Sequence, residues 1–345
     1  MKKNIHFLGV DIGGAHIKIV GLDKSKEICL VEYRKFYFWK DYKNFYNEID
    51  YINSLSIQNI KCAITMTAEL CDVFENRKEG FEFIKNECQR IKFNFFFYVN
   101  KKNNFSKIEG SSYKDIISMN WYSMGKFLEN IFSNAILIDF GSTTTDFVLV
   151  KNGIISNKFF DDFSRLNNNE LIYTGVIRTP IFGLQKTINY NGMKFKIIPE
   201  QFSTTSDLFR IKKKIKNSFD IDEELDCSKK KVQNSYQRVA RSFGLDFSKN
   251  KKKLIDGFCE LLIAHQLNII KKNLKILIKK FIFKSRVPIV ISGIGQDILY
   301  DFLKESHNTF LLENFLNSKN KNLKKKASYH APALCIALLL EDKIE

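Results

Sequence analysis

The sequence predicts an α/β protein made of two domains with a cleft between them. Three observations lead to this prediction: the length of the chain, an alternation of strand-like and helix-like segments, and a hairpin pattern that occurs twice. With 345 residues, the chain is long enough to build two hydrophobic cores of ordinary size. An apolar fraction of 44% and 32 phenylalanines exclude a disordered chain.

The first third of the chain alternates between strands and helices. Three short apolar segments joined by tight turns predict strands at 5–10, 17–22 and 28–36. Further along, amphipathic spacing predicts helices, and apolar runs between them predict buried strands. These helices are expected at 42–55, 77–91 and 120–132, and these strands at 60–67 and 94–100.

After residue 150 the pattern becomes more helical. Helices are expected at 201–215, 234–244 and 252–281, the last being either one kinked helix or two in series. A buried strand at 287–295 runs into a glycine turn and a helix at 296–305, and a terminal helix at 328–341 has Pro332 in its first turn. We expect one α/β domain over 1–118 plus 326–345, and a second, with helical insertions, over 119–325.

The segment "LIDFGSTTTDFVLV" (137–150) is a strand, a turn rich in hydroxyl groups and a returning strand. Its glycine permits a tight turn, and its small residues let a phosphate approach backbone N–H groups and hydroxyls. A carboxylate at each strand end can hold Mg²⁺, usually through water. The candidate residues are Asp139, Gly141, Ser142, Thr143, Thr144, Thr145 and Asp146.

The segment "FLGVDIGGAHIKIVGL" (7–22) repeats this design. It supplies Asp11 at a strand end, Gly13 and Gly14 in the turn, and the cation of Lys18 on the returning strand. Each hairpin alone could be a purely structural glycine turn. The presence of both, each with an acidic residue at the strand end, favours phosphate binding.

Two such hairpins facing a cleft resemble the phosphate loops of the superfamily that includes actin, sugar kinases and heat-shock ATPases (the ASKHA fold). The resemblance covers 11–18 and 139–146, and "VISGIGQDI" (290–298) is similar to the Gly-rich adenosine loop of that superfamily. This resemblance implies the two-domain fold with a central cleft.

Other segments carry more polar groups than a generic kinase requires. In "ITMTAELCDVFENRKEG" (64–80), Glu69, Asp72 and Arg77 follow a buried strand, where open α/β sheets place their ligands. "NNELIYTGVIRTP" (168–180) places Arg178 near a glycine, and "PEQFSTTSDLF" (199–209) has a helix start suited to an anion.

Several strings together resemble the hydantoinase/oxoprolinase-related family of tetrahydromethanopterin-linked one-carbon metabolism. They are "TMTAELCDVFENRKEG", "DFGSTTTD", "ELIYTGVIRTP", "FSTTSD" and the terminal "HAPA". The resemblance extends over essentially the whole chain, although His16 and Ile17 stand where that pattern leads us to expect Asn-Thr. It implies a transferase of methanofuran biosynthesis, in which the phenol of a γ-glutamyl tyramine or tyrosine unit displaces diphosphate from an aminomethylfuran-methyl diphosphate.

The resemblance also implies roles for the candidate residues. Asp11 and Asp139 would position Mg²⁺, with Asp146 as a third candidate. Glu69 or Asp72 would accept the phenol proton or bind the aminomethyl cation, and ATP would not be consumed. The predicted diphosphate ligands are Gly13, Gly14, Lys18, Gly141, Ser142, Thr143, Thr144, Thr145, Arg77 and Arg178.

Two other functions stay open. The superfamily's usual reaction is ATP-dependent phosphoryl transfer, and the hydantoinase/oxoprolinase group opens cyclic amides with ATP. The Gly loop at 293–295 would favour either of these reactions. A non-catalytic nucleotide switch is disfavoured, because the chain contains no obvious peptide-binding domain.

Composition limits the partners and the location. The formal charge is +17, but the lysines are scattered and are not interleaved with aromatic residues, so we expect no nucleic acid partner. No apolar stretch reaches the ~20 residues of a membrane helix. Seven cysteines without a CxxC pair favour a reducing compartment, so we expect a cytoplasmic protein acting on small molecules. The oligomeric state is left open.

Overall fold

A computed structural model of the chain describes residues 4–55, 60–99, 105–107, 112–224, 230–283 and 286–340. The chain divides into two compact units. The first unit comprises Met1–Leu137, Val148–Arg165 and Leu311–Glu345, and the second unit comprises Ile138–Phe147 and Leu166–Phe310.

The first unit is built on a six-stranded sheet with the order β3-β2-β1-β4-β5-β6. Strand β2 runs antiparallel to both of its neighbours, β1 and β3, whereas β4 and β5 run parallel to β1, as crossover helices require. The strands are β1 (Phe7–Ile12), β2 (His16–Leu22), β3 (Ile28–Lys35), β4 (Lys61–Met66), β5 (Asn94–Tyr98) and β6 (Phe105–Ser106). The α-helices are α1 (Phe38–Asp41), α2 (Tyr46–Ser54), α3 (Arg77–Cys88), α4 (Asn120–Glu129), α5 (Asp162–Asn167), α11 (Lys321–Ser328) and α12 (Ala331–Leu339), of which α5 ends beyond the unit boundary.

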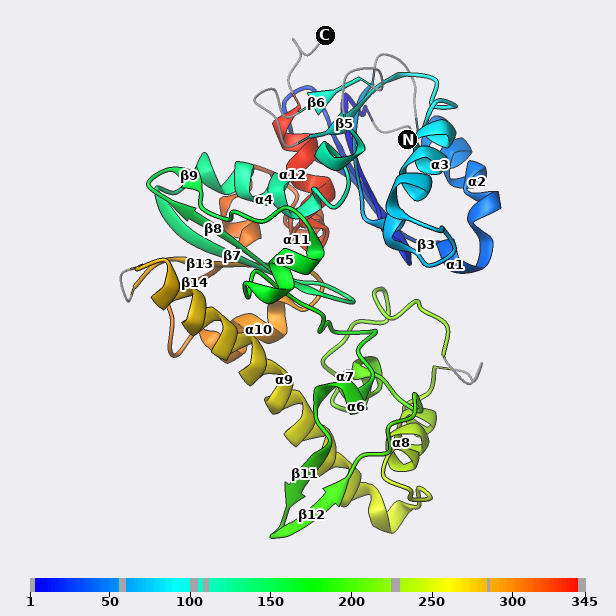
Figure 1. The fold of residues 1–345 in the computed structure, drawn as a ribbon, viewed down its shortest axis with the longest axis vertical. Coiled ribbons are helices and arrows are strands. Elements are labelled where there is room, and N and C mark those ends of the chain that lie inside the picture. The colour runs from blue at the N-terminus through cyan, green and yellow to red at the C-terminus, as the bar shows by residue number, and fades with distance from the viewer. Residues whose placement is uncertain are drawn as a thin grey trace. The chain divides into compact units, whose positions relative to one another are not determined.

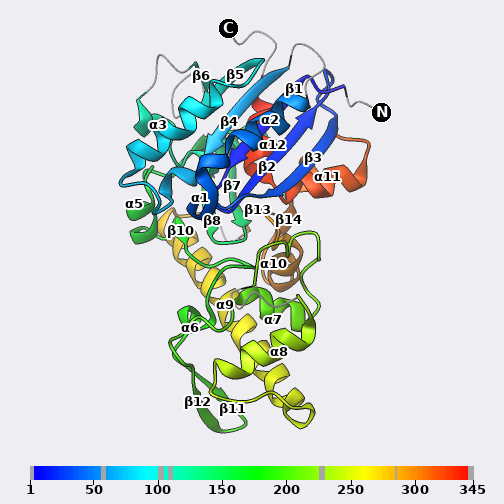
Figure 2. The ribbon, with the colours of Figure 1, turned by 90° about the vertical axis from the view of Figure 1, so that its right-hand side faces the viewer.

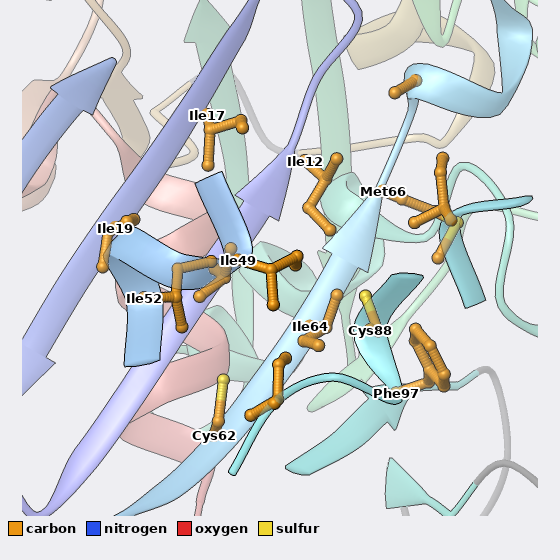
Figure 3. Packing of buried hydrophobic residues seen from close by; sticks show 14 of the residues in the cluster. Ile12, Ile17, Ile19, Ile49, Ile52, Cys62, Ile64, Met66, Cys88 and Phe97 are labelled. Carbon is orange, nitrogen blue, oxygen red and sulfur yellow. The ribbon is translucent and has the colours of Figure 1, made fainter. Parts of the chain in front are cut away.

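Helices cover both faces of this sheet. On one face, Ile49 and Ile52 of α2 lie against Ile12, Ile17 and Ile64 of the strands (Figure 3). On the opposite face, α12 packs against β1, β2 and β4, and Figure 2 shows it behind the strands while α2 lies in front of them.

The approach of α12 depends on a glycine in β1. A Cβ at Gly9 would lie only 2.0 Å from the carbonyl oxygen of Ala333 in α12. A side chain at position 9 would therefore push the helix off the sheet.

The second unit combines a sheet with a group of helices. The sheet has the order β10-β8-β7-β13-β14, and β9 pairs with β8. Its strands are β7 (Asn134–Phe140), β8 (Thr145–Lys151), β9 (Ile154–Ile155), β10 (Leu171–Ile172), β13 (Ile289–Ser292) and β14 (Thr309–Leu311); parts of β7 and β8, all of β9 and the last residue of β14 are assigned to the first unit. The helical part holds α6 (Ile181–Leu184), α7 (Thr205–Ile211), α8 (Val232–Arg241), α9 (Lys252–Lys280), α10 (Gln296–Leu303) and the hairpin of β11 (Thr187–Tyr190) and β12 (Met193–Lys196).

Most elements of the helical part pack against helix α9. It contacts α6, α7, α8, α10 and β11 along its 29 residues, as can be followed in Figure 1. The segment 252–281 therefore forms one helix and not two. None of the helices in the described ranges is both long and apolar enough to cross a membrane.

Most predicted elements form close to their expected bounds. Pro332 occupies the first turn of α12, as expected. The helix predicted at 201–215 is shorter, because Thr204 and Asp207 form a capping box that starts α7 at Thr205, and the helix ends at Ile211. Positions 100 and 341, the last residues of one predicted strand and one predicted helix, lie outside the described residues.

Candidate active site

In the first hairpin, Asp11 lies near the carboxyl end of β1. It pairs in register with Lys18 of β2 and with Thr65 of β4, so the three side chains form a row across three strands. Asp11 is fully buried, and its Oδ2 atom accepts a 2.8 Å hydrogen bond from the Lys18 ammonium. Within the described part of the chain, Asp11 Oδ1 and Thr65 Oγ1 are buried and have no hydrogen-bond partner.

Two buried polar atoms without partners, on neighbouring strands, indicate a place for a ligand. Burying an unsatisfied polar group costs about 1–3 kcal/mol, which a bound water or hydrated ion would relieve. Carboxylate and hydroxyl oxygens suit Mg²⁺, which keeps several water molecules and typically uses only one or two protein carboxylates. Across the described ranges, no group of three or more His, Cys, Asp or Glu side chains is placed to hold a metal. Asp11 and Thr65 therefore supply oxygen ligands of the kind that Mg²⁺ prefers, and because both side chains are fully buried, neighbouring groups would have to move to admit a hydrated ion.

The turn after Asp11 packs against the segment that follows β4. The N–H of Gly13 donates to His16 O at 3.0 Å, which closes the turn. A Cβ at Gly14 would lie 2.7 Å from Cys71 Sγ, and one at Gly13 would lie 3.7 Å from Thr67 Oγ1. The turn at Gly14 therefore lies directly against the 67–71 segment, and a side chain at position 14 would require the Cys71 side chain to move.

Glu69 lies in a single 3₁₀ turn, Ala68–Leu70, directly after β4, and is only 1% exposed. Ser118 Oγ donates a 3.0 Å hydrogen bond to Glu69 Oε1. The other carboxyl oxygen, Oε2, is buried and has no partner among the residues that the structure describes. Gly80 of α3 lets the helix approach, because a Cβ there would lie 2.8 Å from Glu69 Cα.

The protonation of Glu69 reflects this environment. Burial raises the pKa of the Glu69 carboxyl to about 7, although hydrogen bonds from its own backbone and from Ser118 lower it. The positive charge of Arg77 also lowers this pKa, and the negative charge of Asp162 raises it. At neutral pH, Glu69 is thus close to half protonated.

The other two polar candidates of this segment sit in different environments. Asp72 is exposed, so its carboxylate is solvated. Arg77 is half-buried at the first turn of α3. The structure therefore brings Glu69 together with Arg77, and it leaves Asp72 on the surface of the first unit.

In the second hairpin, the turn is closed by a 2.9 Å hydrogen bond from the Gly141 N–H to Thr144 O. Asp139 Oδ1 accepts a 2.6 Å hydrogen bond from Ser292 Oγ, and Asp146 Oδ2 accepts one of 3.4 Å from Thr144 Oγ1. Ser142, Thr143 and Thr144 are partly exposed, whereas the buried hydroxyl of Thr145 donates to Thr174 O at 2.7 Å.

The loop 174–178 lies against this turn. Backbone N–H groups of Ile177 and Arg178 both donate to Ser142 O at 3.0 Å. A Cβ at Gly175 would lie 2.4 Å from the same oxygen. The fully buried Gln266 of α9 donates from Nε2 to Thr174 Oγ1 at 2.9 Å and to Gly175 O at 2.8 Å. Sequence reasoning missed Gln266, and no motif distinguishes it from the other polar residues of its helix.

The Gly loop after β13 also meets the second hairpin. Gly293 has a φ of +86°, and a Cβ there would lie 2.5 Å from Phe140 O and 2.9 Å from Asp139 Oδ1. The Gly295 N–H donates to Phe140 O at 2.9 Å. The predicted glycine loop thus lies beside the carboxylate expected to position Mg²⁺.

The start of α7, which the sequence suggested for an anion, is filled by the protein's own carboxylate. Asp207 is buried and accepts hydrogen bonds from Arg238 Nη2 at 2.6 Å and Arg210 Nη1 at 3.2 Å. Thr205 Oγ1 donates to Gly175 O at 2.9 Å. These hydrogen bonds join α7 to α8 and to the loop at Gly175. The start of α7 therefore has a structural role.

His330 lies in the first unit and is 3% exposed. Burial, followed by the charges of Lys18 and His16, lowers its pKa to about 3, so the imidazole is neutral at physiological pH. Its ring stacks on Tyr33 with centroids 5.0 Å apart, and Tyr33 stacks on His16 at 4.5 Å. This packing gives His330 a structural role in the first unit.

The two hairpins and their sheets define the class of protein. The chain is similar to acetone carboxylase in its nucleotide-free structure, with a TM-score of 0.52, 9% identity, and coverage of 99% of this chain and 71% of that one. The ASKHA fold predicted from the sequence is confirmed. No protein-family model matches the chain.

Two curated relatives carry the same name, (4-{4-[2-(γ-L-glutamylamino)ethyl]phenoxymethyl}furan-2-yl)methanamine synthase. The chain is 30% identical to the Methanocaldococcus jannaschii protein over 353 aligned positions, which cover 99% of both chains. It is also 30% identical to the Methanococcus vannielii protein over 222 positions, covering 63% of this chain and 95% of that one. The chain belongs to the family of this synthase. Neither relative is named as a hydantoinase or oxoprolinase, so that part of the predicted resemblance stays a prediction.

Proposed function

We propose that this protein is a transferase of methanofuran biosynthesis that forms an aryl ether. The phenol oxygen of a γ-glutamyl tyramine or tyrosine unit attacks the methyl carbon of an aminomethylfuran-methyl diphosphate. The new C–O bond forms as the bond to the diphosphate breaks, the diphosphate leaves with the electron pair, and the phenol proton passes to a base.

The observation that carries this proposal is the similarity to the M. jannaschii synthase along the whole chain. The name of that relative describes a phenoxymethyl group that joins a glutamylated phenol to a furan methanamine. An enzyme that makes this ether needs an activated methyl carbon, a site for the leaving group and a proton acceptor for the phenol.

The two hairpins suit the leaving group. Backbone N–H groups and hydroxyls of the turns would donate to diphosphate oxygens, together with the ammonium of Lys18. Mg²⁺ held through Asp11, and through Asp139 and Asp146, would supply charge stabilisation for the departing diphosphate. Arg77 and Arg178 would bind further phosphate or the glutamate carboxylates of the acceptor.

Glu69 suits the role of base better than Asp72. A general base acts best when its pKa lies near the working pH, and the pKa of Glu69 is raised to about 7 by burial. Asp72 is exposed on the surface of the first unit, whereas Glu69 is buried beside Ser118.

The test is mass spectrometry of the purified protein incubated with Mg²⁺, an aminomethylfuran-methyl diphosphate and γ-glutamyl tyramine or tyrosine, with and without ATP. We expect the ether and free diphosphate without an ATP requirement, and comparison of the two phenols identifies the acceptor. ADP formation without ether would overturn the proposal in favour of an ATP-dependent kinase or amidohydrolase.

Four further expectations belong to this proposal. They are a central cleft that brings the hairpins together, an ATP-independent reaction, a cytoplasmic location and kinship with the hydantoinase/oxoprolinase group. The cleft is tested by crosslinking a cysteine introduced at Ser142 (Ser142→Cys) to the native Cys71 in the presence of diphosphate and Mg²⁺.

A further inference from the structure

We propose that Ser118 is a positioning residue for Glu69, which fixes one carboxyl oxygen so that the other receives the acceptor's proton. This inference rests on the proposed function, because it assigns a role to Glu69 as base. Ser118 follows Glu69 by 49 positions in the sequence and lies in none of the segments singled out by sequence motifs.

The backbone of Ser118 is held in an unusual conformation. Its φ is +53°, in the left-handed region that non-glycine residues adopt at a cost. Its N–H donates to Met66 O at 3.2 Å, and the preceding residue, Ile117, forms a parallel bridge with Met66 at the end of β4. The end of β4 therefore fixes Ser118 on one side and leads into the turn of Glu69 on the other.

This placement determines the orientation of the carboxyl group. The Ser118 hydroxyl donates a 3.0 Å hydrogen bond to Glu69 Oε1, and the close packing of Gly80 against Glu69 Cα limits movement of the turn. Oε2 is left without a hydrogen bond from any described residue. A strained backbone, together with a hydroxyl that donates to one carboxyl oxygen while the other has no partner among the described residues, is a feature expected of a preorganised site.

The groups that face Glu69 come from three segments. Ser118 hydrogen-bonds to it from the segment before α4, Arg77 acts on it from α3, and Asp162 acts on it from α5. The hydroxyl of Ser118 stabilises the ionised carboxylate, and so does the charge of Arg77, whereas the charge of Asp162 opposes ionisation. Removal of the hydroxyl should therefore raise the pKa of Glu69 further.

The burial of Glu69 sets a condition for catalysis. Because the Glu69 side chain is 1% exposed, neighbouring side chains must move for the phenol to reach Oε2. Ser118 keeps the carboxyl in one orientation during this movement, since its own backbone is fixed to β4 and not to the exposed part of the 64–80 segment.

The experiment compares Ser118→Ala with Ser118→Gly in the full chain. Both variants lack the hydroxyl, but glycine adopts the left-handed conformation without strain, so Ser118→Gly should melt at a higher temperature than Ser118→Ala. The carboxyl pKa of Glu69 is measured by ¹³C NMR on glutamate-labelled protein without substrates, with Glu69→Gln to assign the resonance. We expect the pKa to rise by on the order of one pH unit in both variants. The acidic limb of the kcat profile should move by the same amount, while KM for the furan diphosphate changes by less than about twofold.

Three results separate this inference from the proposed function. An unchanged Glu69 pKa in both variants, or shifts that follow the two melting temperatures, overturns the role of Ser118. An ether-forming enzyme whose pH profile is unchanged in both variants also overturns it and leaves the proposed function intact. Absence of ether from the wild-type protein overturns the proposed function, and the substrate-free NMR titration then still decides whether Ser118 controls Glu69.

Discussion

Replacing Glu69 with Gln should change how the stability of the first unit depends on pH. The glutamine has nearly the same shape and can still accept a hydrogen bond from Ser118, but it cannot ionise. In the wild-type protein the folded carboxyl has a pKa of about 7, raised by burial from 4.5. Water reaches Glu69 in the unfolded state, so the ionised carboxylate is more stable in the unfolded state than in the folded state.

Linkage between protonation and folding gives the sign and the size of the change in the free energy of unfolding. Below pH 4.5 Glu69 is protonated in both the folded and unfolded states, and its full contribution to stability is present. As pH rises, the unfolded state ionises first, and the contribution is lost progressively until pH passes about 7, above which the loss is complete. A pKa difference of about 2.5 units corresponds to a loss of roughly 3 kcal/mol, since one unit is worth about 1.4 kcal/mol. The free energy of unfolding of Glu69→Gln should not decrease in this way, because glutamine does not ionise.

The assay is urea denaturation followed by tryptophan fluorescence at several pH values between 4 and 9. Both tryptophans of the chain, Trp39 and the fully buried Trp121, lie in the first unit with Glu69, so the signal reports the unfolding of that unit. The matched control is Asp72→Asn, which removes a carboxylate from the exposed part of the same segment and should leave the pH dependence of the wild-type protein unchanged. If the free energy difference between wild type and Glu69→Gln stayed constant over this range, the burial argument would be refuted.

Three further predictions concern the hairpins. Asp11→Asn should weaken Mn²⁺ binding, measured by calorimetry, and reduce turnover by at least ~100-fold with an unchanged circular dichroism spectrum; near-normal turnover would rule out the metal role. Thr65→Val should keep or raise the melting temperature, because it removes a buried hydroxyl without a partner among the described residues, yet weaken Mn²⁺ affinity by about tenfold; unchanged affinity would show that the hydroxyl does not serve the ion. Gly175→Ala should weaken diphosphate binding at least ~10-fold in calorimetry, since its Cβ would lie 2.4 Å from Ser142 O, and equal affinity would mean that the 174–178 loop does not shape the turn.

The parts of the fold that the sequence predicted well are those set by local chemistry. The first hairpin follows from alternating apolar residues and two glycines, and its register places Asp11 opposite Lys18. Pro332 marked the first turn of α12 because its missing N–H has no acceptor there anyway. Local signals of this kind need no knowledge of distant segments.

The sequence could not predict the environment of the candidate base. In the sequence, Glu69 lies among Asp72, Glu75 and Arg77, a neighbourhood that suggests a solvated loop. Its burial comes from Gly80 and from Ser118, which is 49 positions away and reaches Glu69 only because Ile117 bridges to the end of β4. A contact that depends on tertiary packing leaves no pattern in a single sequence, and the same holds for Gln266, 92 positions from Thr174.

Each of the two hairpin turns that resemble phosphate loops packs against a second segment of the chain at a glycine. In the first unit, the turn at Gly14 is close enough to Cys71 that a Cβ would lie 2.7 Å from its sulfur. Cys71 follows the 3₁₀ turn of Glu69 directly, and its N–H donates to Ala68 O at 3.1 Å. The turn expected to bind diphosphate and the turn that holds the candidate base are therefore packed together, and interiors packed this closely transmit displacement between neighbours. A diphosphate that shifted the Gly14 turn would therefore also shift Glu69, and binding of the proposed leaving group would be coupled to placement of the candidate base within one unit.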